Sequence, residues 1–304
     1  MFRPLSFHTL DVFTDKPYRG NPLAVVLEAD GLSTARMQAM AREFNLSETI
    51  FVMAPRDPAN TARVRIFFPT AEIPFAGHPT LGCAVLLATL RNGEGDFTDK
   101  IVLEEEAGLV PVELARKDDL VTGRFCAPVL PHTHAGAAPV GLLEQALGLP
   151  EEKIGFANHQ PATYQGGPAF LYAPVADLDA LAAARPIEPY WSELMEAGQV
   201  DSAYLYTLAS TGSFRARMFS PTAGVPEDPA TGSASAILAA QLLQSGVLPE
   251  GESRFSLVQG VEMGRESQIG LSIRVTDGAL AEVRITGSAV TLARGEIFPP
   301  PEAP

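Results

Sequence analysis

The sequence predicts an α+β protein made of two similar halves, each a curled mixed β-sheet around one buried helix. Three observations lead to this prediction. The chain contains an internal repeat, each copy of the repeat leads into a strongly apolar helix, and strand-like segments surround both copies. The chain has 304 residues, of which 46% are apolar, so each half is large enough to bury its own core.

The internal repeat relates residues 67–87 to residues 219–239. Pro69-Thr70-Ala71 matches Pro221-Thr222-Ala223 at an offset of 152, and Gly82 matches Gly232 at an offset of 150. The two copies therefore differ by a gap of two residues inside the loop. A single repeat half a chain apart indicates two similarly built halves.

Each copy predicts a strand end, a loop rich in Pro and Gly, and a helix, over about residues 79–91 in the first half and 230–244 in the second. These helices have little polar face, because their central residues are almost all apolar. A helix that is apolar on nearly all sides is buried all round, and a sheet curled about it achieves this. The expected boundary lies in the Pro-rich segment 128–139, with an N-terminal lobe over residues 1–130 and a C-terminal lobe over 131–288.

The other elements follow from local patterns. Alternating apolar and polar residues predict a strand over 6–13, and Ser33 is a good N-cap for a helix over 34–44. The remaining strands of the first half are expected at 23–27, 47–53 and 63–68, with three more between 101 and 126. In the second half, helices are expected at 140–147, 177–184 and 189–197, and strands at 168–174, 203–208, 214–219, 254–259, 268–275, 281–285 and 289–297.

Composition limits the possible partners and compartment. The net charge of −14 disfavours binding to nucleic acid or to an anionic membrane, because phosphate binding needs clustered Lys and Arg. The apolar runs are too short to span a bilayer, and the N-terminal residues lack the pattern of a signal peptide. Two cysteines, Cys83 and Cys126, give no disulfide framework. We therefore expect a soluble cytoplasmic protein with two buried thiols.

The two glycine loops are candidate binding elements. A buried helix start leaves N–H groups without partners, and the helix dipole favours negative charge there. Two such starts that face each other would suit a small carboxylate, with Gly77, Gly82, Gly232 and Ser233 as the residues involved. The alternative is that these glycines only fit tight turns and close helix packing.

Three side chains are candidates for chemistry. His78 lies in the first loop, Asp228 lies in the second, and Glu48 begins an apolar strand. A carboxyl group beside Ile50 and Phe51 is desolvated, which raises its pKa and makes it useful as a proton carrier. The alternative for Glu48 is a solvated residue at a strand start.

Five sequence blocks, in order along the chain, resemble those of the phenazine-biosynthesis PhzF-like family. They are Asp11-Val12-Phe13-Thr14, residues 20–25 (GNPLAV), Leu46-Ser47-Glu48-Thr49, Gly77-His78-Pro79-Thr80 and residues 227–234 (EDPATGSA); Gly287-Ser288-Ala289-Val290 resembles the family's C-terminal block. The resemblance implies the diaminopimelate-epimerase-like fold, with two pseudo-symmetric lobes, the site between them, and a last strand, 289–299, that returns to the first lobe.

The resemblance also implies an activity. The family isomerises a small, cyclic, unsaturated amino acid by moving a proton between carbons, with no metal or organic cofactor, and its members tend to be homodimers. Glu48 matches the general acid/base, and His78 and Asp228 match its polar partners. Gly77, Gly232 and Ser233 match the positions that hold the substrate. Cys83 departs from the family pattern, and we assign it to packing.

Other functions of the same fold make different demands on the sequence. A two-thiol racemase of the same fold needs cysteines just before Gly77 and Gly232, where this chain has Ala76 and Thr231, so that mechanism is excluded. An epimerase without thiols and a binding protein without turnover both stay open. His132-Thr133-His134 could offer two metal ligands, but a solvated linker is favoured, because a stable site needs more ligands. No dinucleotide-binding fingerprint is present.

Overall fold

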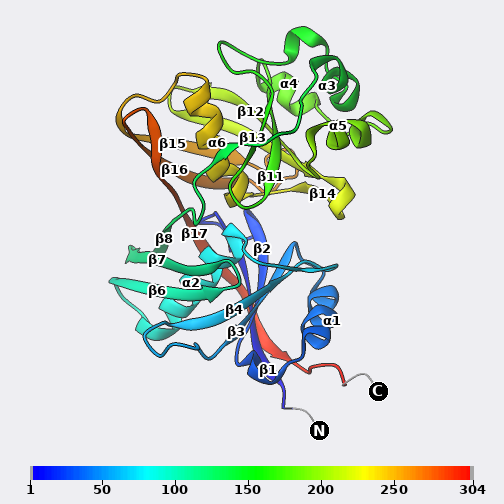
Figure 1. The fold of residues 1–304 in the computed structure, drawn as a ribbon. Helices are drawn as coiled ribbons and strands as arrows, with labels where there is room; N and C mark the ends of the chain where they lie inside the picture. The colour runs from blue at the N-terminus through cyan, green and yellow to red at the C-terminus, as the bar shows by residue number, and fades with distance from the viewer. Residues whose placement is uncertain (1–2, 302–304) are drawn as a thin grey trace. The chain divides into compact units, whose positions relative to one another are not determined.

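The structure, a computed structural model, describes residues 3–301 and divides into two compact units. The first unit consists of Met1–Cys126 and Thr286–Pro304, and the second unit is Ala127–Ile285. The chain enters the second unit just before the Pro-rich segment and returns within the long strand β17 (Ala279–Ile297; Figure 1). The first unit therefore contains both ends of the chain.

Eight strands of the first unit, within its described residues, close into a barrel. Neighbours in the barrel are β1–β2, β2–β3, β3–β4, β4–β6, β6–β7, β7–β8, β8–β17 and β17–β1, of which β2–β3 and β4–β6 are parallel. Their bounds are β1 Leu5–Val12, β2 Asn21–Val26, β3 Glu48–Met53, β4 Ala62–Phe67, β6 Phe97–Glu105, β7 Gly108–Lys117 and β8 Leu120–Cys126; the short β5 (Glu72–Ile73) pairs with β4.

Helix α2 (Gly77–Asn92) lies inside this barrel and contacts β1, β2, β3, β6, β7 and β8. Its close approach to the wall depends on Gly82, where an added Cβ would lie 2.6 Å from Leu23 Cδ2 and 2.7 Å from Val12 Cγ2. Gly82 therefore serves helix packing, which was the alternative explanation of this glycine. Helix α1 (Thr34–Phe44) lies outside the barrel (Figure 1) and packs Met37, Met40 and Ala41 against Phe51 and Phe67.

The second unit repeats the pairing pattern of the first. Strands β11–β12 are parallel, β12–β13 antiparallel, β13–β15 parallel and β15–β16 antiparallel, as are β2–β3, β3–β4, β4–β6 and β6–β7. The bounds are β9 His132–Thr133, β10 Ala162–Gln165, β11 Ala169–Pro174, β12 Ala203–Ser210, β13 Ser213–Ser220, β14 Val225–Asp228, β15 Gly251–Gln259 and β16 Ser267–Thr276. The fold class predicted from the internal repeat is thus confirmed.

Helix α6 (Gly232–Gln244) is the counterpart of α2 and contacts β9, β10, β11 and β16. Three further helices, α3 (Val140–Leu147), α4 (Leu178–Ala183) and α5 (Tyr190–Gly198), build a separate apolar core against the sheet. Trp191 is fully buried in this core. Within residues 3–301, three short 3₁₀ turns lie at Ala29–Gly31, Glu151–Lys153 and Pro221–Ala223.

Two sequence expectations are wrong. Cys83 is buried as expected, but Cys126 is exposed, because it is the last residue of β8 and its side chain points outward. The Pro-rich segment is not a solvated linker throughout, since His132 and Thr133 form β9, which pairs with β10 through Gln165 and Tyr164.

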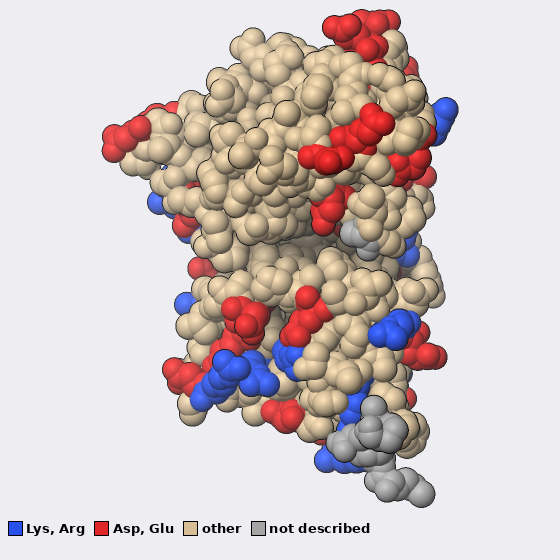
Figure 2. All heavy atoms as spheres, turned by 45° about the vertical axis from the view of Figure 1, so that its right-hand side comes forward, with Lys and Arg blue, Asp and Glu red and all other residues tan. Residues whose placement is uncertain are grey.

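The surface is mixed in charge. Acidic side chains are spread over the face seen in Figure 2, and Lys and Arg side chains lie among them. No helix within residues 3–301 combines the length and the hydrophobicity that a membrane-spanning helix needs.

Candidate active site

The first unit brings Glu48 and His78 together. Glu48 is the first residue of β3 and His78 is the second residue of α2, so a strand start and a helix start meet inside the barrel. His78 Nε2 lies 3.1 Å from Glu48 Oε2, and the two residues are 4% and 7% exposed. Glu48 is therefore buried, and its explanation as a solvated residue at a strand start is wrong.

The imidazole of His78 is neutral. Burial lowers its pKa to about 3. A hydrogen bond to the backbone of Pro22 raises the pKa, but by less than burial lowers it. Proline offers only a carbonyl oxygen, so the ring donates to it, and Nδ1 is the nitrogen left for this bond. Nε2 then faces Glu48 as an acceptor. A hydrogen bond between the two side chains requires the proton to be on Glu48.

A second carboxyl group, Glu105, lies behind the start of α2, and sequence reasoning missed it. Thr80 Oγ1 is 2.6 Å from Glu105 Oε1 and 2.7 Å from the carbonyl oxygen of Ala76. Burial raises the pKa of Glu105 to about 8, with Thr80 acting in the opposite direction. One hydroxyl has one proton, which Thr80 donates to only one of these two oxygens at a time.

In the second unit, Asp228 ends β14 and is 7% exposed. Thr231 Oγ1 donates to Asp228 Oδ2 at 2.6 Å. Gln259, the last residue of β15, donates from Nε2 to the carbonyl oxygen of Asp228 at 2.8 Å and to Thr231 Oγ1 at 3.0 Å. Sequence reasoning used Thr231 only as evidence against a thiol and gave no role to Gln259.

The predicted substrate-holding residues lie at the two helix starts. Gly77 and Gly232 are the first residues of α2 and α6, both are buried, and Ser233 is half-buried. Thr80 and Ser235 donate the first backbone bonds of these helices, to Ala76 and Thr231. The N–H groups of Gly77, Gly232 and Ser233 come earlier in the chain than these first helical donors. N–H groups at this position of a helix are the ones that can bind an anion.

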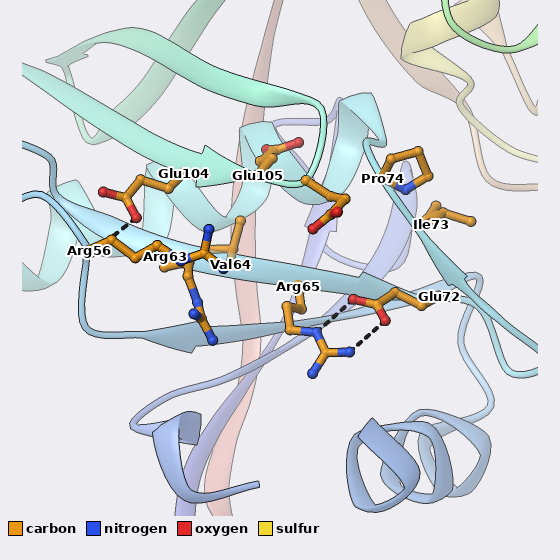
Figure 3. Close-up of a pocket in the computed structure, with 10 residues that line it drawn as sticks. Arg56, Arg63, Val64, Arg65, Glu72, Ile73, Pro74, Glu104 and Glu105 are labelled. Atoms are coloured by element: carbon orange, nitrogen blue, oxygen red, sulfur yellow. Dashed lines mark hydrogen bonds and ion pairs between the residues drawn. The ribbon is translucent and has the colours of Figure 1, made fainter. Parts of the chain in front are cut away.

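A pocket of about 470 Å³ opens in the first-unit barrel where β4 and β6 diverge beyond their last paired residues, Arg63 and Glu104 (Figure 3). Glu105 points from its wall toward the start of α2, whereas Arg63 and Arg65 point the opposite way (Figure 3). Arg65 forms a two-point ion pair with Glu72. The pocket contains none of the residues predicted for the site.

No group of three or more His, Cys, Asp or Glu side chains within the described residues could hold a metal ion. In the His132-Thr133-His134 segment, both ring nitrogens of His134 are engaged, Nδ1 with Gln165 Oε1 at 2.7 Å and Nε2 with the carbonyl oxygen of Gln199 at 3.1 Å. This histidine therefore fastens the segment to its own unit.

These features define a class of protein. Two curled sheets of the same topology, each around a buried helix whose start carries polar side chains, form the diaminopimelate-epimerase-like fold. A sequence model of the PhzC-PhzF family, described as phenazine biosynthesis-like protein, matches residues 10–295. The chain belongs to this family.

Two curated relatives and one solved structure show the range of the similarity. The chain is 43% identical to an uncharacterized isomerase of Mesorhizobium japonicum, over 95% of this chain and 97% of that protein. It is 35% identical to the trans-2,3-dihydro-3-hydroxyanthranilate isomerase of Pseudomonas aeruginosa, over 95% and 98%. A Pseudomonas aeruginosa structure described as a predicted epimerase superposes with a TM-score of 0.79 at 32% identity, covering 97% of this chain and 99% of the other.

Proposed function

We propose that this protein is an isomerase that moves a proton between two carbons of a small substrate bearing a carboxylate. The substrate class is a cyclic, unsaturated, amino acid-like molecule, as in the relative named trans-2,3-dihydro-3-hydroxyanthranilate isomerase. The observation that carries the proposal is the buried carboxyl group of Glu48 opposite an imidazole nitrogen that can only accept a proton. Such a carboxyl group can exist in both protonation states, which proton transfer requires.

In the proposed mechanism, Glu48 is the only group that exchanges a proton with carbon. As a carboxylate it removes a proton from one carbon, and the electron pair moves into the conjugated system. As a carboxylic acid it returns the proton to another carbon, so no proton is consumed overall. His78, through Nε2 as an acceptor, and Asp228 hydrogen-bond the amine or hydroxyl of the substrate.

The remaining groups bind the substrate. N–H groups of Gly77, Gly232 and Ser233 at the helix starts receive its carboxylate. Exclusion of water on binding strengthens these contacts. The proposed enzyme uses no metal or organic cofactor and forms a homodimer, as the family resemblance implies. Its proposed location is the cytoplasm, as expected from the composition and the N-terminal residues.

Two other functions remain to be distinguished. An epimerase of the same fold without thiols is favoured by the relative described as a predicted epimerase. It would invert one carbon and leave every double bond in place. A protein that binds the ligand without turnover is the other possibility, because fold and residues alone do not fix a reaction.

Solvent exchange tests the proposal. The purified protein, treated with a chelator, is incubated in D₂O with trans-2,3-dihydro-3-hydroxyanthranilate and with a panel of related cyclic amino acids, and products are analysed by mass spectrometry and NMR. We expect deuterium at a carbon together with a shifted double bond, and loss of both in Glu48→Gln. Glu43→Gln, on the exposed face of α1, is the control. Deuterium with inverted configuration alone would identify an epimerase, and binding without deuterium would identify a binding protein.

A further inference from the structure

We propose that Gln259 is a positioning residue that fixes the carboxylate of Asp228, acting through the hydroxyl of Thr231. Gln259 touches no reacting atom in this proposal. The expected effect of Gln259 on turnover rests on the proposed function. Its expected effect on Asp228 does not, because all three side chains lie within the second unit and their hydrogen bonds can be tested without a substrate.

The direction of each hydrogen bond follows from the amide of Gln259. Its Oε1 accepts from the backbone N–H of Thr231 at 3.1 Å, which identifies the other amide atom as the donor Nε2. Nε2 donates to the carbonyl oxygen of Asp228 and to Thr231 Oγ1. The hydroxyl of Thr231 therefore accepts from Gln259, and its single proton is directed at Asp228 Oδ2, 2.6 Å away.

Packing holds the amide in place. Gln259 is fully buried and sits in the ladder between Ala216 of β13 and Ser267 of β16. The next residue, Gly260, has φ of +76°, and an added Cβ there would lie 2.7 Å from the carbonyl oxygen of Pro229. The end of β15 thus packs closely against the loop next to Asp228, so the position of that loop depends on the strand end that carries Gln259.

Other polar groups surround the same carboxylate. Tyr204 on β12 lies close enough to interact with Asp228 electrostatically, and its hydroxyl is bonded to Ser235 at 3.1 Å. Glu227, the neighbour of Asp228, is held by Arg217 of β13 through two bonds of 2.8 and 2.9 Å. Thr231 donates a hydrogen bond to the Asp228 carboxylate itself.

The consequence is a carboxylate with a fixed orientation and a preference for the ionised state. A hydrogen bond to the charged form of a carboxyl group favours that form. Without Gln259, the Thr231 hydroxyl is free to rotate away. Asp228 should then bind a proton more readily and hold a ligand amine or hydroxyl less well.

Carboxyl titration of Asp228 by carbon-13 NMR tests this without any substrate. Gln259→Met keeps the length of the side chain but removes the donor and the acceptor of its amide, and Thr231→Val removes the hydroxyl with little change in shape. Both variants should raise the Asp228 midpoint by about one pH unit, the equivalent of one modest hydrogen bond. Thr231→Ser, which keeps the hydroxyl, should leave the Asp228 midpoint as it is in the unaltered protein.

Matched controls separate positioning from stability. Gln241 is also a buried glutamine, near the far end of α6, where it donates to the carbonyl oxygen of Gln160. Gln241→Met should lower the melting temperature yet leave the Asp228 titration unchanged. Because Gln259 acts through Thr231, Gln259→Met combined with Thr231→Val should shift the midpoint no further than either change alone.

Turnover gives the second readout. On a substrate identified by solvent exchange, Gln259→Met and Thr231→Val should each lower kcat/KM roughly tenfold, and Thr231→Ser should recover most of the loss. An unchanged Asp228 titration in folded Gln259→Met and Thr231→Val protein would overturn the proposal. If Gln259→Met does not fold, Thr231→Val decides alone. Absence of turnover in the unaltered protein would count against the proposed function, and the titration would still decide the role of Gln259.

Discussion

Glu105 and Gln259 occupy equivalent positions in the two units. Glu105 is the last residue of β6 and follows the pair Arg63 and Glu104, and Gln259 is the last residue of β15 and follows the pair Arg215 and Val258. Both side chains hydrogen-bond the start of the adjoining buried helix segment, Glu105 at Thr80 and Gln259 at Thr231. Glu105 can gain or lose a proton, whereas Gln259 cannot. At this position, therefore, only the first unit has a side chain that can make stability depend on pH.

Glu105 should make stability fall with rising pH. Its pKa is 4.5 as a free side chain and about 8 in the fold, so between these values the unfolded chain has lost a proton that the folded chain keeps. The free energy of unfolding therefore falls by roughly 1.4 kcal/mol per pH unit across this window, and the contribution is fully present only below pH 4.5.

Urea denaturation at several pH values measures this effect. Glu105→Gln removes the titration, so the difference in unfolding free energy between variant and unaltered protein should shift in favour of the variant as the pH rises from 4.5 to 8. Glu106→Gln, an exposed neighbour, is the control. A difference that stays constant over this range would show that Glu105 is ionised throughout.

His78 should remain neutral and carry its proton on Nδ1 at every pH at which the enzyme works. Burial lowers its pKa to about 3, and Pro22 accepts a hydrogen bond from the ring. Nitrogen-15 NMR of labelled histidine should show this single tautomer from pH 5 to 8, with no titration. His132, exposed on β9, serves as the internal comparison. A doubly protonated ring at pH 6 would contradict the assignment of Nε2 as the acceptor facing Glu48.

Gly82→Ala should destabilise the first unit. The new methyl group would lie 2.6 Å from Leu23 Cδ2 and 2.7 Å from Val12 Cγ2 inside a closed barrel, and overpacking of this kind costs about 1–3 kcal/mol. Thermal and urea unfolding measure the change. Gly141→Ala, at an exposed position of helix α3 where an added Cβ would meet no atom within 4 Å, should instead stabilise by roughly 0.5–1 kcal/mol. Equal effects at the two glycines would argue against close packing at Gly82.

Arg217→Lys should cost more stability than Arg65→Lys, although the two arginines are 152 residues apart, the offset of the internal repeat, and each lies just before its copy of the repeat. Arg217 is bonded to Glu227 and to the carbonyl oxygens of Leu181, Ala182 and Ala184 at the end of α4, and its side chain is 9% exposed. Arg65 pairs with Glu72 and Thr34, and its side chain is 24% exposed.

Lysine cannot reproduce the planar two-point contact. We expect a loss of roughly 2–3 kcal/mol at Arg217 and below about 1 kcal/mol at Arg65, measured by urea unfolding. The reverse order would indicate that the bonds to α4 contribute little.

The internal repeat allowed much of the fold to be predicted. Strand–loop–helix segments with matching apolar helices could be recognised because the period of apolar residues is a local property. Glu48 and His78 were also identified, and the structure places them in contact. The short strands β5, β9, β10 and β14 were missed, since two to four residues carry too little pattern and pairing alone makes them strands.

The sequence by itself determined the two matched halves, their buried helices and the candidate side chains, because composition and spacing follow from neighbours along the chain. Only the tertiary structure decided how those side chains are held. Glu105, Thr231 and Gln259 carry no sequence signal, since a polar residue at a strand end is ordinarily solvated. Their roles arise because the folded units bury them beside polar partners, Glu105 beside Thr80 and Gln259 beside Thr231, which lie 25 and 28 residues away along the chain.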